Sequence, residues 1–191
     1  MQVPTLDDLT WPVRTERLTI RRLRPEDAEA VAAYRSDPAL MTWQAGLLAD
    51  AASFVRDFEG WTAVNLAVEH EGRLVGDVHL RVHDAWTQAE AADRGRDAQA
   101  ELGWTLSRAA QGRGFGREAG EAMLAIAFEG LGVRRVVGEC FAANAASWRL
   151  MESLGMRREA HHVRDGLHAE LGWLDGYLYA LLAEEWKERR R

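Results

Sequence analysis

A glycine-rich loop that joins an extended segment to a long amphipathic helix constrains this chain more than any other feature. The loop reads Gln111-Gly112-Arg113-Gly114-Phe115-Gly116 and follows the extended segment 100–106. After it, small and apolar residues recur at helical spacing over 119–127. Glycine lets successive backbone amides turn toward one point, and a following helix adds its own free amides and dipole. The pattern predicts an anion site for phosphate, although a flexible connection between strand and helix explains the loop alone nearly as well.

Two familiar phosphate-binding loops do not fit this segment. A P-loop requires Gly-Lys-Ser/Thr, whereas Lys187 is the only lysine in the chain. A dinucleotide-binding fingerprint requires Gly-x-Gly-x-x-Gly, and Ala119 stands where a third glycine would follow Gly114 and Gly116. That fingerprint also belongs close after the first strand of its unit, whereas about four strands are expected before this loop.

Length and composition predict one globular domain over residues 1–191, because the chain is 47% hydrophobic and 28% charged. Cys140 is the only cysteine, which excludes an internal disulfide and a multi-cysteine zinc site, and no metal is expected. The net charge of −6 argues against nucleic acid and weakly favours cationic acceptors such as amines. No apolar run is long enough to span a membrane, and the acidic start lacks the basic region of a secretory signal. We therefore expect a cytoplasmic protein without a membrane partner.

The rest of the sequence predicts mixed strands and helices. Pro25 and the two acidic residues after it begin a helix, whereas Asn144 can cap another helix that ends at Gly155. A polar turn that contains glycine joins two strands as a hairpin. The expected strands are 14–24, 63–69, 74–82, 100–106, 134–141, 156–163 and 171–182. Further helices are expected at 49–58, after the glycine loop and at 144–154. We expect an exposed loop at 84–99 and a charged tail at 184–191.

Two motifs resemble those of the GNAT (Gcn5-related) N-acetyltransferases. The glycine loop is similar to the Gln/Arg-x-x-Gly-x-Gly/Ala segment with which that family grips the pyrophosphate of acetyl-coenzyme A. The stretch Asn144-Ala145-Ala146-Ser147-Trp148-Arg149-Leu150-Met151-Glu152-Ser153-Leu154-Gly155-Met156 resembles the Asn-x-x-Ser-x-Arg-x-x-Glu-x-Leu-Gly-Phe/Met segment of the RimJ/RimL-like branch. Residues 15–21 and 25–28 also resemble that branch, so the resemblance covers residues 14–182.

The resemblance implies an α/β fold of the α+β type. Its central sheet is expected to be mixed and mostly antiparallel, with six to seven strands, splayed central strands and about four flanking helices. Acetyl-CoA is implied as a co-substrate whose pantetheine pairs with strand backbone and whose pyrophosphate meets the loop amides. The residues implied in cofactor binding are Trp104, Thr105, Leu106, Gln111, Gly112, Arg113, Gly114, Phe115, Gly116, Arg117, Asn144 and Ser147. A plain helix cap explains Asn144 nearly as well.

The family's chemistry is direct attack of an amine on the thioester, which needs a base for the amine and an acid for the departing thiolate. Glu139 and Glu101 are the candidate bases, and each can instead be an ordinary carboxylate on a strand surface. Met151 stands where many relatives carry a tyrosine as the acid. Ser147 is the favoured substitute, and its alternative role is capping the first helical turn.

The resemblance therefore predicts an enzyme, an acetyl-CoA-dependent N-acetyltransferase that acts on a primary amine. A protein N-terminal α-amine is the first acceptor expected, and a small-molecule or antibiotic amine is the second. Because the tyrosine is missing, a non-catalytic acyl-CoA-binding sensor stays open, as does an unrelated α/β interaction domain. By analogy, a homodimer is also expected.

Overall fold

The computed structural model describes residues 4–44, 51–56 and 58–190, and these residues form two compact units. Of the described residues, the N-terminal unit comprises 10–44, 51–56, 58–79 and 104–122. The C-terminal unit comprises 4–9, 80–103 and 123–190. The strands β4 (Arg73–His83) and β5 (Gln99–Leu106) and the helix α6 (Phe115–Ala125) contribute residues to both units.

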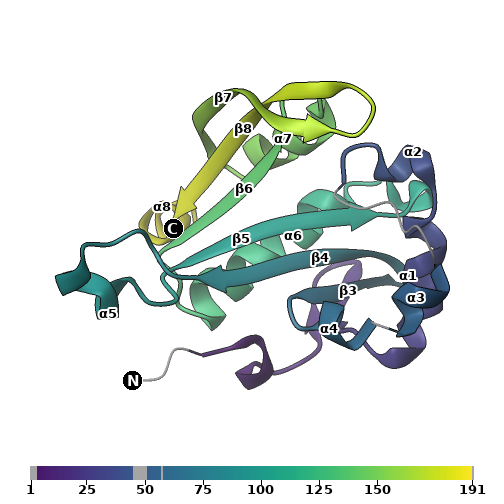
Figure 1. The fold of residues 1–191 in the computed structure, drawn as a ribbon. Coiled ribbons are helices and arrows are strands. Elements are labelled where there is room, and N and C mark those ends of the chain that lie inside the picture. The colour runs from purple at the N-terminus through teal and green to yellow at the C-terminus, as the bar shows by residue number, and fades with distance from the viewer. Residues whose placement is uncertain (1–3, 45–50, 57, 191) are drawn as a thin grey trace. The chain divides into compact units, whose positions relative to one another are not determined.

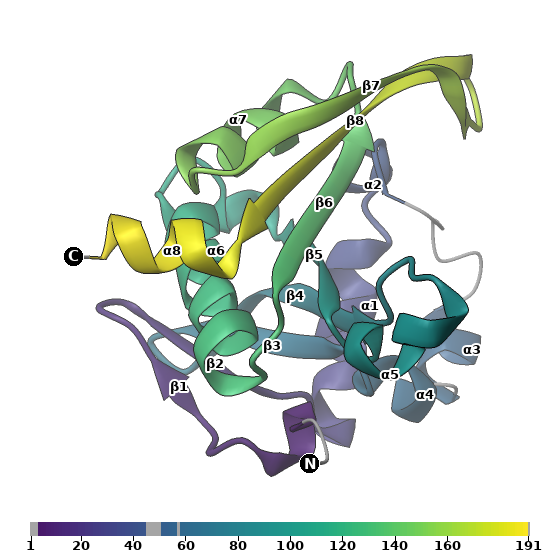
Figure 2. The ribbon, with the colours of Figure 1, turned by 90° about the vertical axis from the view of Figure 1, so that its left-hand side faces the viewer.

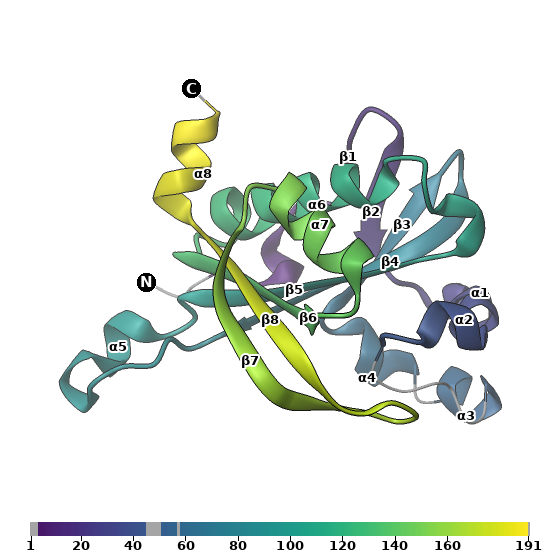
Figure 3. The same cartoon turned by 90° about the horizontal axis from the view of Figure 1, so that it is seen from above.

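The N-terminal unit contains an antiparallel arrangement in which β1 (Val13–Arg14) pairs with β2 (Leu18–Arg22), β2 with β3 (Asn65–His70) and β3 with β4. These strands lie side by side in Figure 3. Ile20 of β2 and Leu66 and Val68 of β3 are completely buried, as expected for apolar side chains on a covered face. The hairpin turn between β3 and β4 uses Glu71 and Gly72 at φ 51° and 74°, the left-handed pair that a tight two-residue hairpin requires.

Four helices precede β3 in the N-terminal unit. They are α1 (Ala28–Arg35), which follows a 3-10 turn at Pro25–Asp27, α2 (Pro38–Met41), α3 (Ala51–Arg56) and α4 (Phe58–Thr62). Val31 of α1 and Phe58 of α4 pack with Ala67 of β3, and the rings of Phe54 and Trp61 meet edge to face at 5.5 Å. The short helix α4 lies beside β3 in Figure 1, whereas α3 lies beside α1. They are therefore held by aromatic packing rather than by their own length.

The C-terminal unit joins parallel and antiparallel strands. Strand β5 pairs in parallel with β6 (Arg135–Phe141), while β8 (Gly172–Leu182) pairs antiparallel with both β6 and β7 (Arg157–His168). The parallel pairing covers only Gln99 to Glu101 against Arg135 to Val137, although β6 continues to Phe141. This early end of the pairing fits the splayed strands expected from the sequence.

Helices complete the C-terminal unit. Figure 2 shows α7 (Ala145–Ser153) along one side of the β6–β8–β7 strands, and the buried side chains of Met151 and Leu154 account for this contact. Helix α6 continues as a π-helical turn, Ile126–Gly130, and ends near Gly132 at φ 70°. The C-terminal helix α8 (Ala183–Arg189) packs Trp186 against Phe128, and the indole Nε1 donates to Glu129 at 2.8 Å.

The fold class and most expected elements are confirmed, with specific corrections. The described residues form eight strands rather than six or seven, because the first expected strand is divided into β1 and β2. They form eight α-helices rather than about four, because α2, α5 and α8 lie where no helix was expected and the helix expected at 49–58 corresponds to α3 and α4. Residues 49, 50 and 57 of that helix lie outside the described residues. The expected loop 84–99 holds the short helix α5 (Ala92–Gly95), and the expected charged tail is α8. The described helices include none with the length and apolar character needed to cross a bilayer.

Candidate functional site

The glycine loop opens α6 and presents a run of unused backbone donors. Gly112 and Gly114 have φ 72° and 81°, so left-handed glycines alternate with ordinary residues. The amides on either side of the run are bonded, since Gln111 N donates to Arg108 O and Glu118 N donates to Gly114 O. Within the described part of the chain, the amides of residues 112–117 make no hydrogen bond. Such a run forms the kind of concave donor set that binds anions.

Side chains around the loop fix it to the end of β5. The Gln111 amide nitrogen Nε2 donates to the Leu106 carbonyl at 3.1 Å. Phe115 is buried, whereas Gln111 to Gly114 are exposed. The Arg113 guanidinium lies 4.5 Å from the centre of the Phe115 ring, and Arg117 forms an ion pair with Glu121 at 3.0 Å. The donors therefore face solvent from a loop whose one apolar side chain is anchored in the core.

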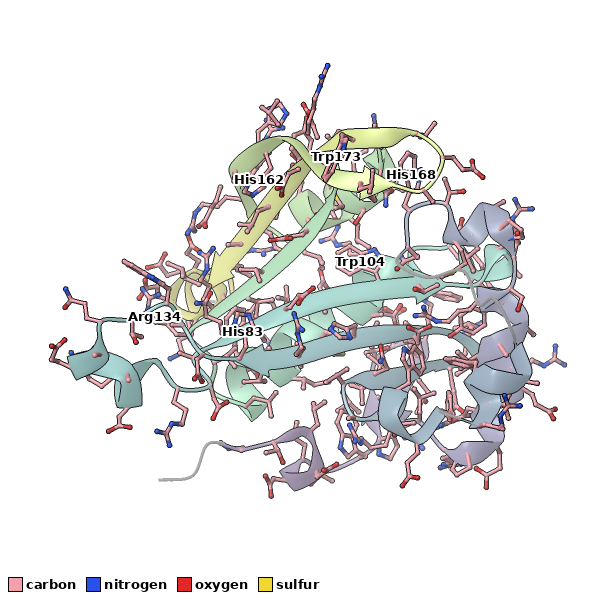
Figure 4. All side chains as sticks on the ribbon, viewed as in Figure 1. His83, Trp104, Arg134, His162, His168 and Trp173 are labelled. Carbon is pink, nitrogen blue, oxygen red and sulfur yellow. The ribbon has the colours of Figure 1, made fainter. Side chains whose placement is uncertain are left out.

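The C-terminal half of β5 carries the three residues expected to pair with pantetheine. Figure 4 marks Trp104, whose carbonyl accepts a hydrogen bond from Gln44 Nε2 at 3.1 Å. Thr105 is buried, and its hydroxyl accepts from Arg35 Nη2 at 3.2 Å. A carbonyl oxygen has two lone pairs, so the bond from Gln44 leaves the Trp104 carbonyl one further site for an incoming donor.

A buried polar cluster that the sequence analysis did not identify lies beside Thr105. Asp77 of β4 accepts hydrogen bonds from the Tyr34 hydroxyl and from Arg35, whose Nη2 approaches Asp77 Oδ1 to 2.6 Å. Burial and the nearby Asp77 carboxylate both raise the pKa of Tyr34, so its hydroxyl stays protonated and donates. The Arg35 guanidinium also lies 4.7 Å from the centre of the Trp61 ring. No local sequence pattern joins these residues, because Asp77 is more than forty positions from its partners.

The other predicted residues lie in the C-terminal unit. Asn144 caps α7, since its Oδ1 accepts from Ser147 N at 3.2 Å. Burial raises the pKa of the Cys140 thiol, and a hydrogen bond with Ser147 partly offsets that rise. Glu139 is exposed on β6. Met151 is completely buried, with its Sδ 2.8 Å from where a Cβ on Gly138 would lie, so it has a packing role rather than that of an acid.

Glu101 and Glu139 differ in their surroundings. Glu101 of β5 forms an ion pair with Arg81 of β4 at 2.5 Å. The backbone of Glu139 pairs with Leu178 of β8, but its carboxylate makes no hydrogen bond or ion pair with a residue that the structure describes. A base must have a free oxygen for the proton it accepts, and the carboxylate of Glu139 meets this condition without breaking an ion pair.

The predicted residues thus fall into two sets. The N-terminal unit brings Trp104–Leu106 together with Gln111–Arg117, and the C-terminal unit holds Glu101, Glu139, Asn144 and Ser147. Across residues 4–44, 51–56 and 58–190, no group of three or more His, Cys, Asp or Glu side chains is arranged to hold a metal ion.

Comparisons with known proteins agree on one family. A family profile for the acetyltransferase (GNAT) domain matches residues 17–157. The uncharacterized N-acetyltransferase YnaD of Bacillus subtilis is 30% identical over 91% of this chain and 98% of its own length. YdaF of the same organism, provisionally named a ribosomal N-acetyltransferase, is 25% identical over 90% of this chain and 94% of its own. The crystal structure of a GNAT-family acetyltransferase from Bacillus anthracis has a TM-score of 0.78 at 29% identity, covering 92% of this chain and 100% of the other.

Proposed function

Since this chain belongs to the GNAT family of acetyltransferases, which use acetyl-CoA and act on amine acceptors, we propose that it binds acetyl-CoA at the glycine loop and acetylates a protein N-terminal α-amine. The observation that carries the cofactor part is the run of unbonded amides over residues 112–117. Each amide that meets a charged phosphate contributes about 1.5–3 kcal/mol, so a few suffice to hold a pyrophosphate. The name of the relative YdaF supports the choice of acceptor.

The loop fits a pyrophosphate in shape as well as in donors. A Cβ on Gly112 would meet no atom within 4 Å, which leaves the space above it open. Gly114 has φ 81°, a conformation that side chains rarely adopt. The side chains of Arg113 and Arg117 add positive charge at the same place. Trp104, Thr105 and Leu106 are the proposed partners of the pantetheine arm.

The proposed reaction has two proton transfers, one from the amine and one to the sulfur, and one residue is assigned to each. The bound thioester supplies the acetyl group, and the amine nitrogen forms a bond to its carbonyl carbon as the carbon–sulfur bond breaks. Glu139 takes the proton that the amine loses, directly or through a water molecule, with Glu101 as the alternative base. Ser147 relays a proton to the sulfur, because its hydroxyl donates to the departing thiolate and takes a proton from water in exchange. Asn144 holds the first turn of α7 that carries Ser147.

The first experiment tests cofactor binding through the loop. Acetyl-CoA at a hundred times its dissociation constant adds about 2.7 kcal/mol to the free energy of unfolding, which appears as a rise in Tm. Gly114→Glu abolishes that rise, because it places a side chain and a negative charge against the phosphates. Gly132→Glu is the matched control, since Gly132 also has a left-handed φ of 70° and open space around a Cβ. Retained affinity in Gly114→Glu would overturn the assignment of the loop.

The second experiment identifies the acceptor by release of free thiol. The panel contains peptides with free N-termini, the same peptides with blocked N-termini, polyamines and aminoglycosides. We expect turnover with free N-termini and none with the blocked peptides. Turnover with polyamines or aminoglycosides alone would assign a small-molecule acceptor, and cofactor binding without turnover on any acceptor would assign a sensor.

A further inference from the structure

Arg17, just before β2, contacts the start of α6 through both its backbone and its side chain. Glu118, in the first turn of that helix, accepts from Arg17 N and Nε at 2.7 Å each and from the Thr15 hydroxyl at 2.5 Å, and its Oε2 also forms an ion pair with Arg17 Nη2 at 2.7 Å. Burial on its own raises the pKa of Glu118, but the hydrogen bonds from Thr15 and Arg17 hold it below its ordinary value. Both oxygens of this carboxylate are therefore committed to the segment before β2, and Glu118 serves as an anchor for Arg17.

The guanidinium of Arg17 also contacts the glycine loop. Its Nη1 donates to the Arg113 carbonyl at 2.9 Å, its guanidinium lies 4.9 Å from the centre of the Phe115 ring, and its Nη2 lies 3.3 Å from where a Cβ on Gly114 would be. Arg17 thus contacts Arg113 and Phe115 and lies beside Gly114, which stands between them in the loop.

The bond to the Arg113 carbonyl has a consequence for the amides. In a trans peptide the C=O and the N–H of one plane point in opposite directions. Because Arg17 draws the Arg113 carbonyl toward itself, the amide of Gly114 in the same plane points away from Arg17. That amide belongs to the unbonded run over residues 112–117.

His70, at the end of β3, contacts the side chain of Arg113, the residue whose carbonyl Arg17 binds. Its Nδ1 lies 3.0 Å from the Arg17 carbonyl, and its Nε2 lies 3.2 Å from Arg113 Nη2. A carbonyl only accepts, so Nδ1 carries the proton and Nε2 accepts from the guanidinium. Arg113 is therefore fixed at its carbonyl by Arg17 and at its guanidinium by His70.

We propose that Arg17 is a positioning residue that sets the direction of the loop amides and thereby the affinity of the enzyme for the pyrophosphate of acetyl-CoA. It acts through Arg113 and Gly114 and is anchored by Glu118 and Thr15. This inference rests on the proposed function of the loop.

The test compares two acetyl donors that differ in the pyrophosphate. Acetyl-CoA carries this group, and S-acetylpantetheine does not. We expect Arg17→Met to raise KM for acetyl-CoA about tenfold or more, as loss of a charge-assisted hydrogen bond implies. The kcat with acetyl-CoA, and both kcat and KM with S-acetylpantetheine, should stay within about twofold of the wild-type values. Calorimetric titration with CoA gives the same loss of affinity without turnover.

Matched variants separate positioning from folding. Arg14→Met removes an exposed arginine whose side chain, among the residues described, bonds only to Thr19, at 3.4 Å; the constants for both acetyl donors should stay unchanged. Arg17→Lys keeps the charge but cannot hold Glu118 and the Arg113 carbonyl together, so it recovers part of the affinity. If Arg17→Met does not fold, Glu118→Gln serves as a second variant. It keeps the shape of the side chain but removes the negative charge that anchors Arg17, and it should also raise KM for acetyl-CoA.

Two failures are distinguishable. If wild-type enzyme binds CoA no better than pantetheine, the loop does not bind pyrophosphate and the proposed function fails. If the wild type prefers CoA and Arg17→Met retains the full preference, the role of Arg17 is overturned and the loop assignment stands. An equal loss with both donors would likewise show that Arg17 is only structural.

Discussion

Gly76 of β4 is the position at which adding one methyl group should most disturb β5, the strand that carries the proposed cofactor residues. A Cβ built on Gly76 would overlap the Thr105 carbonyl oxygen and would lie 2.7 Å from Leu106 Cδ2 and 2.9 Å from Leu106 Cα. Leu106 Cδ2 is the end of a flexible side chain, but the other two atoms are backbone atoms of β5. The Thr105–Leu106 segment must therefore move in Gly76→Ala.

The size of the effect follows from those contacts. Overpacking a well-filled site costs about 1–3 kcal/mol, and two backbone clashes place Gly76→Ala at the upper end, about 3 kcal/mol. For a chain of this length, 1 kcal/mol corresponds to about 2–4 °C in Tm, so we expect a loss of roughly 6–12 °C. The backbone conformation adds nothing, because Gly76 does not have a left-handed φ.

Thermal unfolding followed by circular dichroism measures this loss, with Gly60→Ala as the control. Gly60 lies in α4, where a Cβ would meet no atom within 4 Å, so alanine there should be neutral or should stabilise by about 0.5–1 kcal/mol. Gly76→Ala should also weaken binding of CoA at temperatures where the variant is folded, because Thr105 and Leu106 are proposed cofactor partners. A Tm for Gly76→Ala within about 2 °C of wild type would refute the packing argument.

Four further substitutions test other parts of the chain. Asp77→Asn leaves a buried cation without its partner and should cost about 3–5 kcal/mol by urea unfolding, whereas Tyr34→Phe should cost about 1 kcal/mol; equal losses would contradict this account. The lowered pKa of Glu118 means that its stabilisation is present above its ordinary value of 4.5 and is lost as the pH falls through the lower folded value. Tm measured from pH 7 to 3 should therefore fall less steeply in Glu118→Gln than in wild type. Glu139→Gln should slow turnover by about a hundredfold or more, most at low pH, and unchanged rates would move the base to Glu101 or solvent.

The elements that the sequence predicted well are those fixed by local chemistry. Asn144 and Gly155 bound α7, because a side-chain cap and a left-handed glycine act within one helical turn. The β3–β4 hairpin followed from its polar turn for the same reason. Helix α8 was missed because its one buried side chain, Trp186, bonds to Glu129, 57 positions earlier. No pattern within 184–191 carries that information.

The candidate site divides in the same way. The glycine loop was recognisable because its function depends on the backbone of adjacent residues. The contacts of Arg17 with Glu118 were not, because 101 positions separate them and each residue taken alone fits an ordinary exposed charge. The pairing of Tyr34 with Asp77 across 43 positions was hidden for the same reason.

The choice between the two candidate bases shows what geometry adds to a list of carboxylates. In sequence, Glu101 and Glu139 are equivalent, since each is an acid on a strand. In the structure, Oε2 of Glu101 is bound to Arg81 at 2.5 Å, so a proton arriving on that carboxylate would neutralise it and weaken an ion pair. Glu139 is exposed and makes no such contact with any described residue. An acceptor amine attacks only after it has lost its proton, and a carboxylate with a free oxygen can take that proton without first giving up a partner. The same reasoning removes Met151 as an acid, because it is buried and has no proton to give, and the hydroxyl of Ser147 on α7 stays the proposed donor.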